Sequence, residues 1–484
     1  MSDEVFQRSS EIAASAEDLF AWHARPAAFF LLQPPWERVA VEAVEGPFGN
    51  GQRVHLRVGI WGPLRLRWLA ELHSVEPGRQ FCDRQVHGPF AAMNHTHRMI
   101  PRGAGQCLLE DHIAYRLPLG ALGRLLAGRK IRRQFDRMFT YRHRVTRAQL
   151  QWWSRYRHQP RLRVLVTGSR GMIGNPLCWM LVCGGHQVIR LAHGHGERRR
   201  LLDGTELRWW DPDRGQLDPT DLADVDAVIH LAGESVASGR WTAAKKERIR
   251  TSRVKATELL CQTLARLPRR PATLLSASAI GWYGDRGVHE LTEEDAAGMG
   301  FLSEVCQVWE AATQPAREAG IRTALLRIGV VLGLTGGALA KQVLPFWLGA
   351  GSRLGHGRQY VSWISLDDAL GAIHHVLMHP ELAGPVNVTA PHPVTNQEYT
   401  AVLARVLRRP AWGVLPEGAA QLLFGDLARE LLLASTRVVP ARLLETGFQF
   451  EYPTLAAALR HQLGRYSPTE PAGPSASPGE VGKT

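Results

Sequence analysis

A glycine-rich stretch near residue 170 constrains the fold of this 484-residue chain more than any other feature. The run Val164–Val166 is short and apolar, as expected of a strand buried on both faces of a parallel sheet. Gly168, Gly171 and Gly174 follow and lead into an apolar segment. The first glycine would make a tight turn, the second would admit a pyrophosphate, and the third would let helix and strand pack closely. We therefore predict a dinucleotide site contacted by Gly168, Ser169, Arg170, Gly171, Met172, Ile173 and Gly174.

The end of the next predicted strand, 187–192, indicates which dinucleotide binds. An NAD site usually has an acidic residue there to bind the ribose 2′-hydroxyl, but here none occurs before Glu197. Arg190, His193 and the run Arg198–Arg200 lie around this turn instead. A solvated basic loop is the alternative interpretation of the arginine run. We predict NADP in preference to NAD, with Arg190 and His193 at the cofactor.

Strands alternate with helices from Leu162 to about residue 400, which predicts a doubly wound parallel sheet of the Rossmann type. A third strand would end at Asp211, and a fourth, 227–230, would end in a turn of small residues beside the cofactor. This turn adds three candidate cofactor contacts: Leu231, Ala232 and Gly233. Two more strands are expected at 273–278 and 323–328.

The length and composition predict two or three domains of a cytoplasmic globular protein. Hydrophobic residues make up 45% and charged residues 21% of the chain, which are values typical of soluble proteins. We expect neither a signal peptide nor a transmembrane segment, because no long apolar run occurs. The six cysteines show no paired or zinc-binding spacing, so we expect reduced and mostly buried thiols.

The formal net charge of +13 is concentrated in one segment. Between Arg124 and Arg163, Asp136 is the single acid among thirteen basic residues. Apolar residues recur there at helical spacing, which predicts a helix with one apolar and one solvated basic face: Leu125, Leu126, Ile131, Phe135, Met138 and Phe139. Weak contact with an anionic surface is the alternative role for this segment. The clustering argues against nucleic acid as a partner.

Residues 1–155 are predicted to form a separate domain. A short strand and a capped helix at 15–22 precede strand-like runs at 37–44, 53–58, 64–72, 80–86, 92–99 and 106–115. With the long closing helix, this order resembles the START-like, polyketide-cyclase-like ligand-binding fold, an α+β helix-grip domain. Several local motifs carry the resemblance: Pro34–Glu37, Arg67–Trp68, Phe81–Gln85, Gly88–Phe90, His95–His97 and Leu117–Gly120. The resemblance implies an apolar ligand in a cavity between sheet and helix.

His95 and His97 share one face of a predicted strand, as two metal ligands could. No third ligand can be placed from the sequence. We therefore predict no metal site and expect both histidines to line a pocket or the sheet surface.

The remaining boundaries follow from composition. A polar, proline-broken link near residues 154–161 separates the first domain from a dinucleotide-binding domain over 162–400. Residues 401–466 are predicted to be helical, with helices at 401–407, 419–434 and 454–463. Residues 467–484 are rich in Pro, Ser and Gly, which predicts a disordered tail.

Residues from about 162 to 465 resemble the NAD-dependent epimerase/dehydratase proteins, a branch of the extended short-chain dehydrogenases. The resemblance rests on motifs along this whole region: Thr167–Gly174, His230–Ser235, Arg240–Trp241, Ile249–Val254, Ser276–Gly284, Phe301–Cys306, Trp309–Glu310, Arg327–Gly333, Ser362–Ile364, Asp367–Asp368, Gly384–Asn387 and Pro440–Leu444. It implies that Asp211 binds the adenine edge, and it makes a nucleotide sugar one candidate substrate.

The catalytic residues depart from this family's pattern. Short-chain dehydrogenases use a Tyr-x-x-x-Lys pair, in which Lys lowers the pKa of Tyr. None of the eight tyrosines is followed by Lys four residues later, and Phe301 and Val305 stand at the expected place. Ser278 fits the hydroxyl that orients a substrate oxygen. Tyr283 and Glu304 are the substitute proton donors that we predict, with a packing tyrosine and a surface glutamate as the alternatives.

Two hypotheses for function follow. The first is an NADP-dependent oxidoreductase or epimerase that acts on a carbonyl or hydroxyl group of a small molecule. The second is a dinucleotide-binding sensor, ligand carrier or scaffold without catalysis, which the missing Tyr–Lys pair favours.

Overall fold

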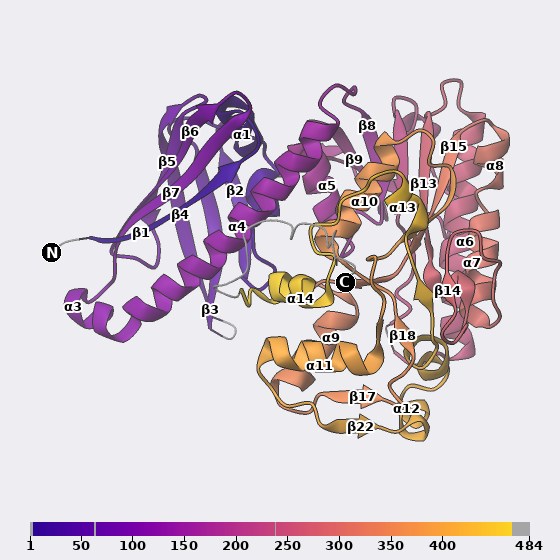
Figure 1. The fold of residues 1–484 in the computed structure, drawn as a ribbon. Helices are drawn as coiled ribbons and strands as arrows, with labels where there is room; N and C mark the ends of the chain where they lie inside the picture. The colour runs from indigo at the N-terminus through magenta and orange to yellow at the C-terminus, as the bar shows by residue number, and fades with distance from the viewer. Residues whose placement is uncertain (1–2, 62–63, 238, 467–484) are drawn as a thin grey trace, which may run out of the picture.

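The structure is a computed structural model that describes residues 3–61, 64–237 and 239–466. Figure 1 shows two large β-sheets side by side, with one long helix that runs from the first sheet to the second. The first sheet is built from residues before 117 and the second from residues after 162. The predicted disordered tail, 467–484, lies outside the described residues.

The N-terminal sheet is antiparallel, in the order β1-β7-β6-β5-β4-β3-β2. Helices α1 (Ala16–His23) and α2 (Ala28–Leu31) connect β1 to β2, and the Ser15 hydroxyl caps α1 by accepting from the Asp18 N–H. The predicted helix and strands are confirmed, although β4 and β6 extend further than expected. The strands are β1 (Glu4–Ile12), β2 (Val39–Glu45), β3 (Arg53–Trp61), β4 (Leu64–Glu76), β5 (Gln80–His87), β6 (Ala92–Gly103) and β7 (Gln106–Arg116).

The long helix α4 (Arg129–Arg155) follows α3 (Gly120–Gly123) and a π-helical turn, η1 (Arg124–Gly128). In its first half, Phe135 and Phe139 are buried, whereas Arg129, Lys130, Arg132 and Arg133 are exposed, as predicted. Leu125 and Leu126 do not belong to the apolar face: they are 83% and 73% exposed. They precede α4 in the π-helical turn, where the angular spacing of side chains differs from that of an α-helix.

The second half of α4 packs between the two sheets. Its Trp153 lies against Gly184, at the end of α5 (Gly174–Cys183), and its Trp152 against Gly371 in α10 (Leu366–Met378). One hydrophobic cluster contains residues of α1, α4, α5, α10 and the second sheet. The predicted solvated basic face is therefore found in the first half of α4. In the second half, where elements of the second sheet pack against the helix, Arg142, Arg144 and Arg147 are only partly exposed.

The second sheet has the order β10-β11-β9-β8-β12-β13-β15-β20, and every pair except β10–β11 is parallel. Without β10, the first six strands run 3-2-1-4-5-6, the order of dinucleotide-binding sheets. The predicted doubly wound sheet is confirmed. Its strands are β8 (Arg163–Thr167), β9 (Gln187–His193), β10 (Arg199–Arg200), β11 (Glu206–Trp210), β12 (Ala227–His230), β13 (Thr273–Ala279), β15 (Arg322–Ile328) and β20 (Gly384–Val388).

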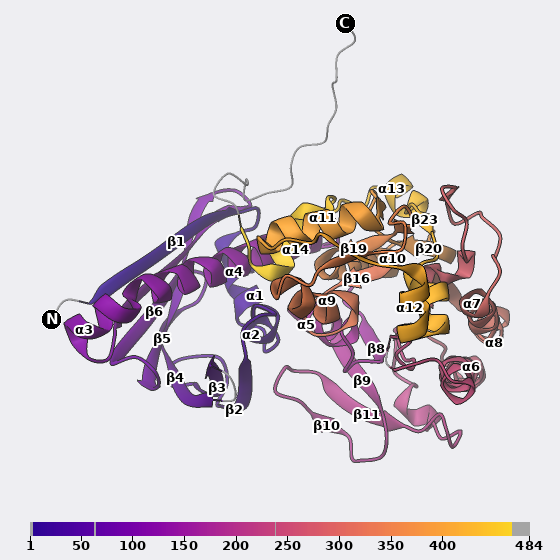
Figure 2. The ribbon, with the colours of Figure 1, turned by 90° about the horizontal axis from the view of Figure 1, so that it is seen from below.

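Helices cover both faces of this sheet (Figure 2). Helices α5 and α10 pack on one face, where Val164 and Val166 of β8 join the shared cluster. Helix α6 (Ala243–Arg266) packs on the other face, against Leu165. Helices α7 (Phe301–Ala311) and α8 (Gln314–Glu318) lie beside α6. The alternation of buried faces along β8 explains its uninterrupted apolar sequence.

The C-terminal region is helical only in part. Helix α11 (Asn396–Leu407) and α14 (Leu455–Leu463) match the predictions, but the helix predicted over 419–434 is broken. Gly425, with φ of +62°, ends α12 (Glu417–Phe424), and a π-helical turn, η4 (Ala428–Leu432), follows. The region also contains helix α13 and two short strands, β22 and β23, which pair with strands of earlier loops, β17 and β14. The remaining elements are η2 (Pro219–Asp221), η3 (Ile280–Tyr283), α9 (Gly337–Trp347), α13 (Ala441–Glu445), β14 (Glu290–Leu291), β16 (Val330–Leu332), β17 (Ser352–Leu354), β18 (Tyr360–Val361), β19 (Trp363–Ser365), β21 (Val394–Thr395), β22 (Gly413–Leu415) and β23 (Arg437–Val438).

All six cysteines are buried free thiols, as predicted. In the described part of the chain, no helix combines the length and apolar composition needed to cross a bilayer.

Candidate functional site

The loop between β8 and α5 has the close backbone packing that its three glycines allow. Gly168 has φ of +62°, and a Cβ there would lie 2.5 Å from the carbonyl oxygen of Leu231. A Cβ on Gly174 would overlap the carbonyl oxygen of Gly168. Gly171 donates its N–H to the same oxygen at 2.9 Å. The loop therefore closes tightly over the start of α5, where the positive end of the helix dipole favours an anion.

Ser169 provides a direct test of whether this loop fits a phosphate. The residue is 2% exposed, and its hydroxyl oxygen has no hydrogen-bond partner in the structure. A buried hydroxyl without a partner is unfavourable by about 1–3 kcal/mol, and a cofactor phosphate would supply the missing acceptor. The glycine loop and this hydroxyl together fit a bound dinucleotide. The contacts predicted for residues 168 to 174 stay a prediction.

Arg190 does not have the role that we predicted. It is 3% exposed, and its guanidinium donates to the Thr205 hydroxyl, the Ser169 carbonyl, the Asn175 amide oxygen and the Asp203 carboxylate at 2.6–2.9 Å. These bonds engage all three of its nitrogens, so Arg190 is a buried support that holds the phosphate loop through Ser169 and Asn175. It is not placed to bind a 2′-phosphate.

Arg170 and His193 lie on the exposed side of the same region. The Arg170 guanidinium lies over the Trp209 ring, 5.0 Å from its centroid, and is exposed. His193 is also exposed, with its Nε2 3.5 Å from a carboxylate oxygen of Asp211. Asp211 is 7% exposed and accepts the N–H groups of residues 213 and 214. The ends of β9 and β11 thus present an aromatic ring with an exposed guanidinium over it.

The turn after β12 is held by a hydrogen-bond chain. The N–H groups of Leu231 and Ala232 donate to the Thr167 hydroxyl, which in turn donates to Nδ1 of His230 at 2.7 Å. Nε2 of His230 then donates to the Thr257 hydroxyl at 3.0 Å. Burial lowers the pKa of His230 to about 4, so the ring is neutral. This chain ties the predicted cofactor turn to helix α6.

Arg253 is a candidate site residue that the sequence argument missed. Its guanidinium carbon would lie 3.3 Å from a Cβ on Gly233, and it stacks over Trp309 at 4.9 Å. Its Nη1 donates to the Ile249 carbonyl. A cation is therefore fixed beside the predicted cofactor turn. Arg253 lies in the motif 249–254, but no physical signal in that motif marked it as an anion ligand.

Ser278 belongs to a buried ionic network. Its hydroxyl donates to Glu310 at 2.6 Å, and Arg327 binds both carboxylate oxygens of Glu310 at 3.0 and 3.1 Å. Ser278 is 3% exposed. The network fixes the orientation of the hydroxyl, as an orienting group requires. Glu310 belongs to the motif Trp309–Glu310, but no local sequence pattern links it to Ser278.

The structure argues against both substitute proton donors. Tyr283 is fully buried, and its hydroxyl donates to the Asn387 amide oxygen at 2.8 Å while accepting from Arg327 at 3.0 Å. Burial raises its pKa to about 12, so it is a poor acid near neutrality. Glu304 lies on the exposed face of α7, whereas Glu310 lies on the buried face. The packing tyrosine and the surface glutamate are the better interpretations.

Phe301 and Val305 occupy α7 where a Tyr–Lys pair was sought. Phe301 packs edge-on against Trp241 and beneath the Lys246 ammonium, and Val305 is buried. Neither side chain can exchange a proton.

The parallel sheet and its glycine loop define a dinucleotide-binding protein of the Rossmann type. Residues 164–389 match the model of the NAD dependent epimerase/dehydratase family, and residues 415–462 match a domain of unknown function, DUF1731. An epimerase family protein of Mycobacterium tuberculosis is 42% identical over 302 residues, which cover 62% of this chain and 98% of the relative. The human epimerase family protein SDR39U1 is 33% identical over 302 residues, which cover 62% of this chain and 99% of the relative.

This chain belongs to the NAD-dependent epimerase/dehydratase family. The crystal structure of human SDR39U1 (isoform 2) with NADPH is similar with a TM-score of 0.56 and 32% identity, over 62% of this chain and 98% of that one. A Corynebacterium glutamicum structure described as a nucleoside-diphosphate sugar epimerase is similar over nearly the whole molecule. Its TM-score is 0.77 at 31% identity, over 95% of this chain and 90% of that one.

Proposed function

We propose that this chain is an NADP-dependent epimerase or oxidoreductase that acts on a carbonyl or hydroxyl group of a nucleotide sugar. The observation that carries the proposal is the phosphate loop, where three glycines pack closely and the buried Ser169 hydroxyl lacks a partner. Family membership and the NADPH-bound relative support the dinucleotide.

The preference for NADP rests on the groups at the end of β9. No carboxylate ends this strand, and the exposed Arg170 guanidinium lies over Trp209. A guanidinium can bind a 2′-phosphate with two parallel hydrogen bonds. We therefore reassign the predicted 2′-phosphate contact from the buried Arg190 to Arg170.

Residues of the chain would position the substrate and bind its anionic group. The bound nicotinamide supplies hydride transfer. Ser278 keeps lone pairs on an oxygen that Glu310 orients, so it can bind and position a substrate hydroxyl. Arg253 can bind an anionic group of the substrate beside Gly233. A nucleoside diphosphate is an anion of this kind, and the described substrate class of the Corynebacterium relative is consistent with it.

The second candidate is a dinucleotide-binding sensor or carrier without catalysis. Phe301 and Val305 in α7 favour it, because they leave no Tyr–Lys pair. Both candidate functions predict cofactor binding, but only the first predicts that a substrate is turned over.

For the N-terminal domain we infer a START-like, helix-grip architecture, supported by the seven-stranded antiparallel sheet against α4. The aromatic cluster between them includes Phe6, Phe135 and Phe139. Binding of an apolar ligand there stays a prediction.

We further propose that the start of the long helix contacts an anionic membrane surface. Four leucines are exposed at this tip, next to exposed basic residues that include Arg124 and Arg129: Leu119, Leu122, Leu125 and Leu126. Apolar and basic side chains together bind anionic lipid surfaces. Exchange of Leu125 and Leu126 for Gln should reduce sedimentation with phosphatidylserine vesicles, whereas Leu444→Gln should not. Equal sedimentation of all three proteins would contradict this.

Turnover tests the main proposal. The purified chain is incubated with NADPH and, in turn, each member of a panel of carbonyl compounds and nucleotide sugars, and products are detected by mass spectrometry. Gly171→Asp serves as the control, because it places a carboxylate in the phosphate loop and should abolish cofactor binding and turnover. NADPH binding without any turnover across the panel would favour the sensor.

A further inference from the structure

The interior of the N-terminal domain contains a cluster of imidazoles and carboxylates. Asp83 of β5 pairs directly across the sheet with His95 of β6, and Asp111 of β7 pairs with His97. Because alternate residues of a strand share a face, these four side chains meet on the side of the sheet that α4 covers. From α4, His143 reaches Asp111 with its Nε2 at 2.6 Å.

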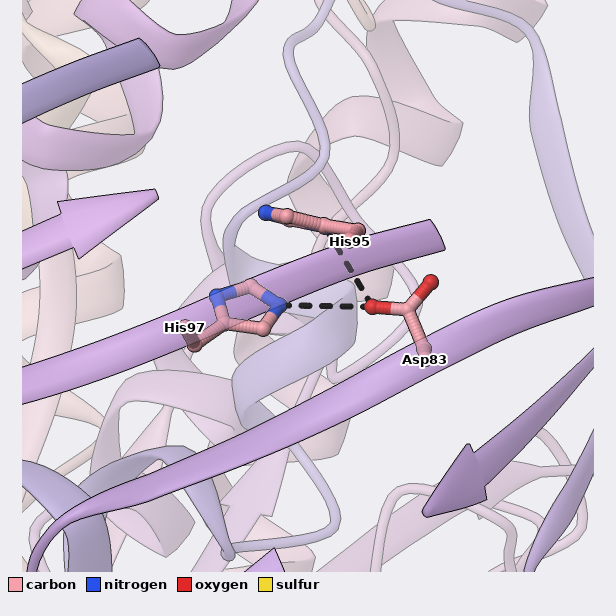
Figure 3. A group of neighbouring side chains, drawn as sticks. All are labelled: Asp83, His95 and His97. Atoms are coloured by element: carbon pink, nitrogen blue, oxygen red, sulfur yellow. Dashed lines mark ion pairs between the residues drawn. The ribbon is translucent and has the colours of Figure 1, made fainter. Parts of the chain in front are cut away.

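Figure 3 shows both imidazoles directed at Asp83. Nδ1 of His95 and Nε2 of His97 lie 3.3 and 3.4 Å from the same carboxylate oxygen. Charge-assisted N–H···O bonds are shorter, about 2.7–2.9 Å. The corners of a tetrahedral site with metal–ligand bonds of 2.0–2.2 Å, however, lie about 3.3–3.5 Å apart. One ligand atom from each of the three residues lies within 4.8 Å of the others.

Asp111 contacts the opposite side of both rings. One of its oxygens lies 2.9 Å from Nε2 of His95 and 2.6 Å from Nδ1 of His97. With Asp111 accepting the Nε2–H of His95, the Nδ1 of His95 is left as a lone pair directed at Asp83. The Nδ1 of His97 contacts the same Asp111 oxygen but makes no hydrogen bond in the described structure. This is the outer-shell arrangement that orients metal-ligating histidines. His143 and Ser10 fix Asp111 in turn, the imidazole Nδ1 lying 2.9 Å from the Ser10 hydroxyl.

Burial and charge fit a cation. His95, Asp111 and His143 are each 3% exposed. One divalent ion would neutralise the buried Asp111 and the partly buried Asp83 carboxylates among these imidazoles. The Asp83 carboxylate is 24% exposed, which leaves a path to solvent.

We propose that Asp83, His95 and His97 bind a divalent transition-metal ion such as Zn²⁺, with Asp111 as the orienting carboxylate. Three protein ligands leave a fourth position for water or a small anionic ligand. The site is separate from the dinucleotide loop, and it replaces our prediction of no metal site, which rested on the lack of a third ligand that the sequence could place. The third ligand came from a neighbouring strand whose pairing the sequence did not reveal.

Metal titration of the full-length chain tests the proposal. After dialysis against a chelator, the chain should bind one Zn²⁺ by calorimetry, and Co²⁺ should give the visible absorption of a tetrahedral site. Asp83→Asn and His97→Gln should each weaken Zn²⁺ binding at least about 100-fold, and Asp111→Asn about 10–100-fold. His55→Gln is the matched control, because His55 lies on β3 and pairs with Glu45.

Retained NADPH binding would show that each variant is folded. If His97→Gln destabilises the domain, Asp83→Asn still tests the site, because Asp83 is partly exposed. The proposal would be overturned if the parent chain bound no stoichiometric Zn²⁺, or if Asp83→Asn and His97→Gln bound it as tightly as His55→Gln.

Discussion

At the scale of single residues, the candidate site contains side chains that hydrogen bonds hold in one orientation and others that only lie nearby. The Ser278 hydroxyl is fixed by Glu310, and Glu310 by Arg327. Glu304, one turn and a half earlier on α7, faces solvent. Tyr283 has its hydroxyl bound on both sides inside the protein. Hydrogen-bond geometry therefore indicates a residue's chemical role better than its closeness in sequence to the predicted cofactor motifs.

This distinction predicts different effects for three conservative substitutions. Ser278→Ala should lower any NADPH-dependent turnover about 10²–10⁴-fold, because an orienting hydroxyl is lost, with NADPH affinity unchanged. Glu304→Gln should leave turnover within a few-fold. Tyr283→Phe should instead lower the free energy of unfolding by about 1–2 kcal/mol, because the Asn387 amide oxygen and Nη1 of Arg327 each lose a buried hydrogen-bond partner. Steady-state rates and urea unfolding measure both effects, and full activity of Ser278→Ala would remove Ser278 from the site.

At the scale of elements, a neutral buried histidine connects two strand ends of the second sheet to helix α6. His230 ends β12 and connects Thr167 of β8 to Thr257 of α6. Burial lowers its pKa to about 4, whereas the unfolded chain has a histidine pKa near 6.5. The unfolded state therefore binds more protons between these values, so stability is complete above about pH 6.5 and falls as the pH decreases towards 4.

We predict that His230 accounts for about 2 kcal/mol of the stability lost between pH 7 and pH 5. In His230→Gln this component of the pH dependence should disappear, although stability at pH 7 is also reduced. His356→Gln, at an exposed position, should keep the parent's pH dependence. Urea unfolding at both pH values measures the difference, and an unchanged pH slope in His230→Gln would show that this ring is not the group responsible.

The elements were predicted more completely than the contacts between them. Periodicity located the strands of both sheets, because burial on one or two faces leaves a local pattern. It did not show that Arg190 would be buried behind the phosphate loop, because its partners Asp203 and Thr205 lie after a turn. For the same reason, the pairing of Asp83 with His95 and the link from Ser278 to Glu310 were not visible. These contacts depend on strand register and tertiary packing, which no local pattern encodes.

At the scale of the whole molecule, the two domains behave as one packed unit around α4. Trp152 and Trp153 fill the space above Gly371 and Gly184, and the ring of Tyr141 stacks on His461 with centroids 4.9 Å apart. Arg147 pairs with Glu451 across the same interface at 2.9 Å. The proline-broken link after α4 marks a boundary in sequence, but the hydrophobic core continues across it.

Gly184→Ala tests this shared core. The new methyl group would overlap the Trp153 ring, so we predict a loss of about 1–3 kcal/mol in the free energy of unfolding. Gly418→Ala is the matched control, since a Cβ there meets nothing within 4 Å, and it should change stability by less than about 1 kcal/mol. Unfolding followed by tryptophan fluorescence compares the two. Equal stabilities would mean that the domains do not pack as described.

We propose that this member of the epimerase/dehydratase family binds NADP through the loop 168–174 and Arg170. Calorimetric titration of the purified chain with NADPH and with NADH tests it most directly. We predict that NADPH binds at least tenfold more tightly, about 1.4 kcal/mol, and that Arg170→Gln removes most of this difference without weakening NADH binding. Equal affinities for the two dinucleotides, or tighter binding of NADH, would contradict the claim.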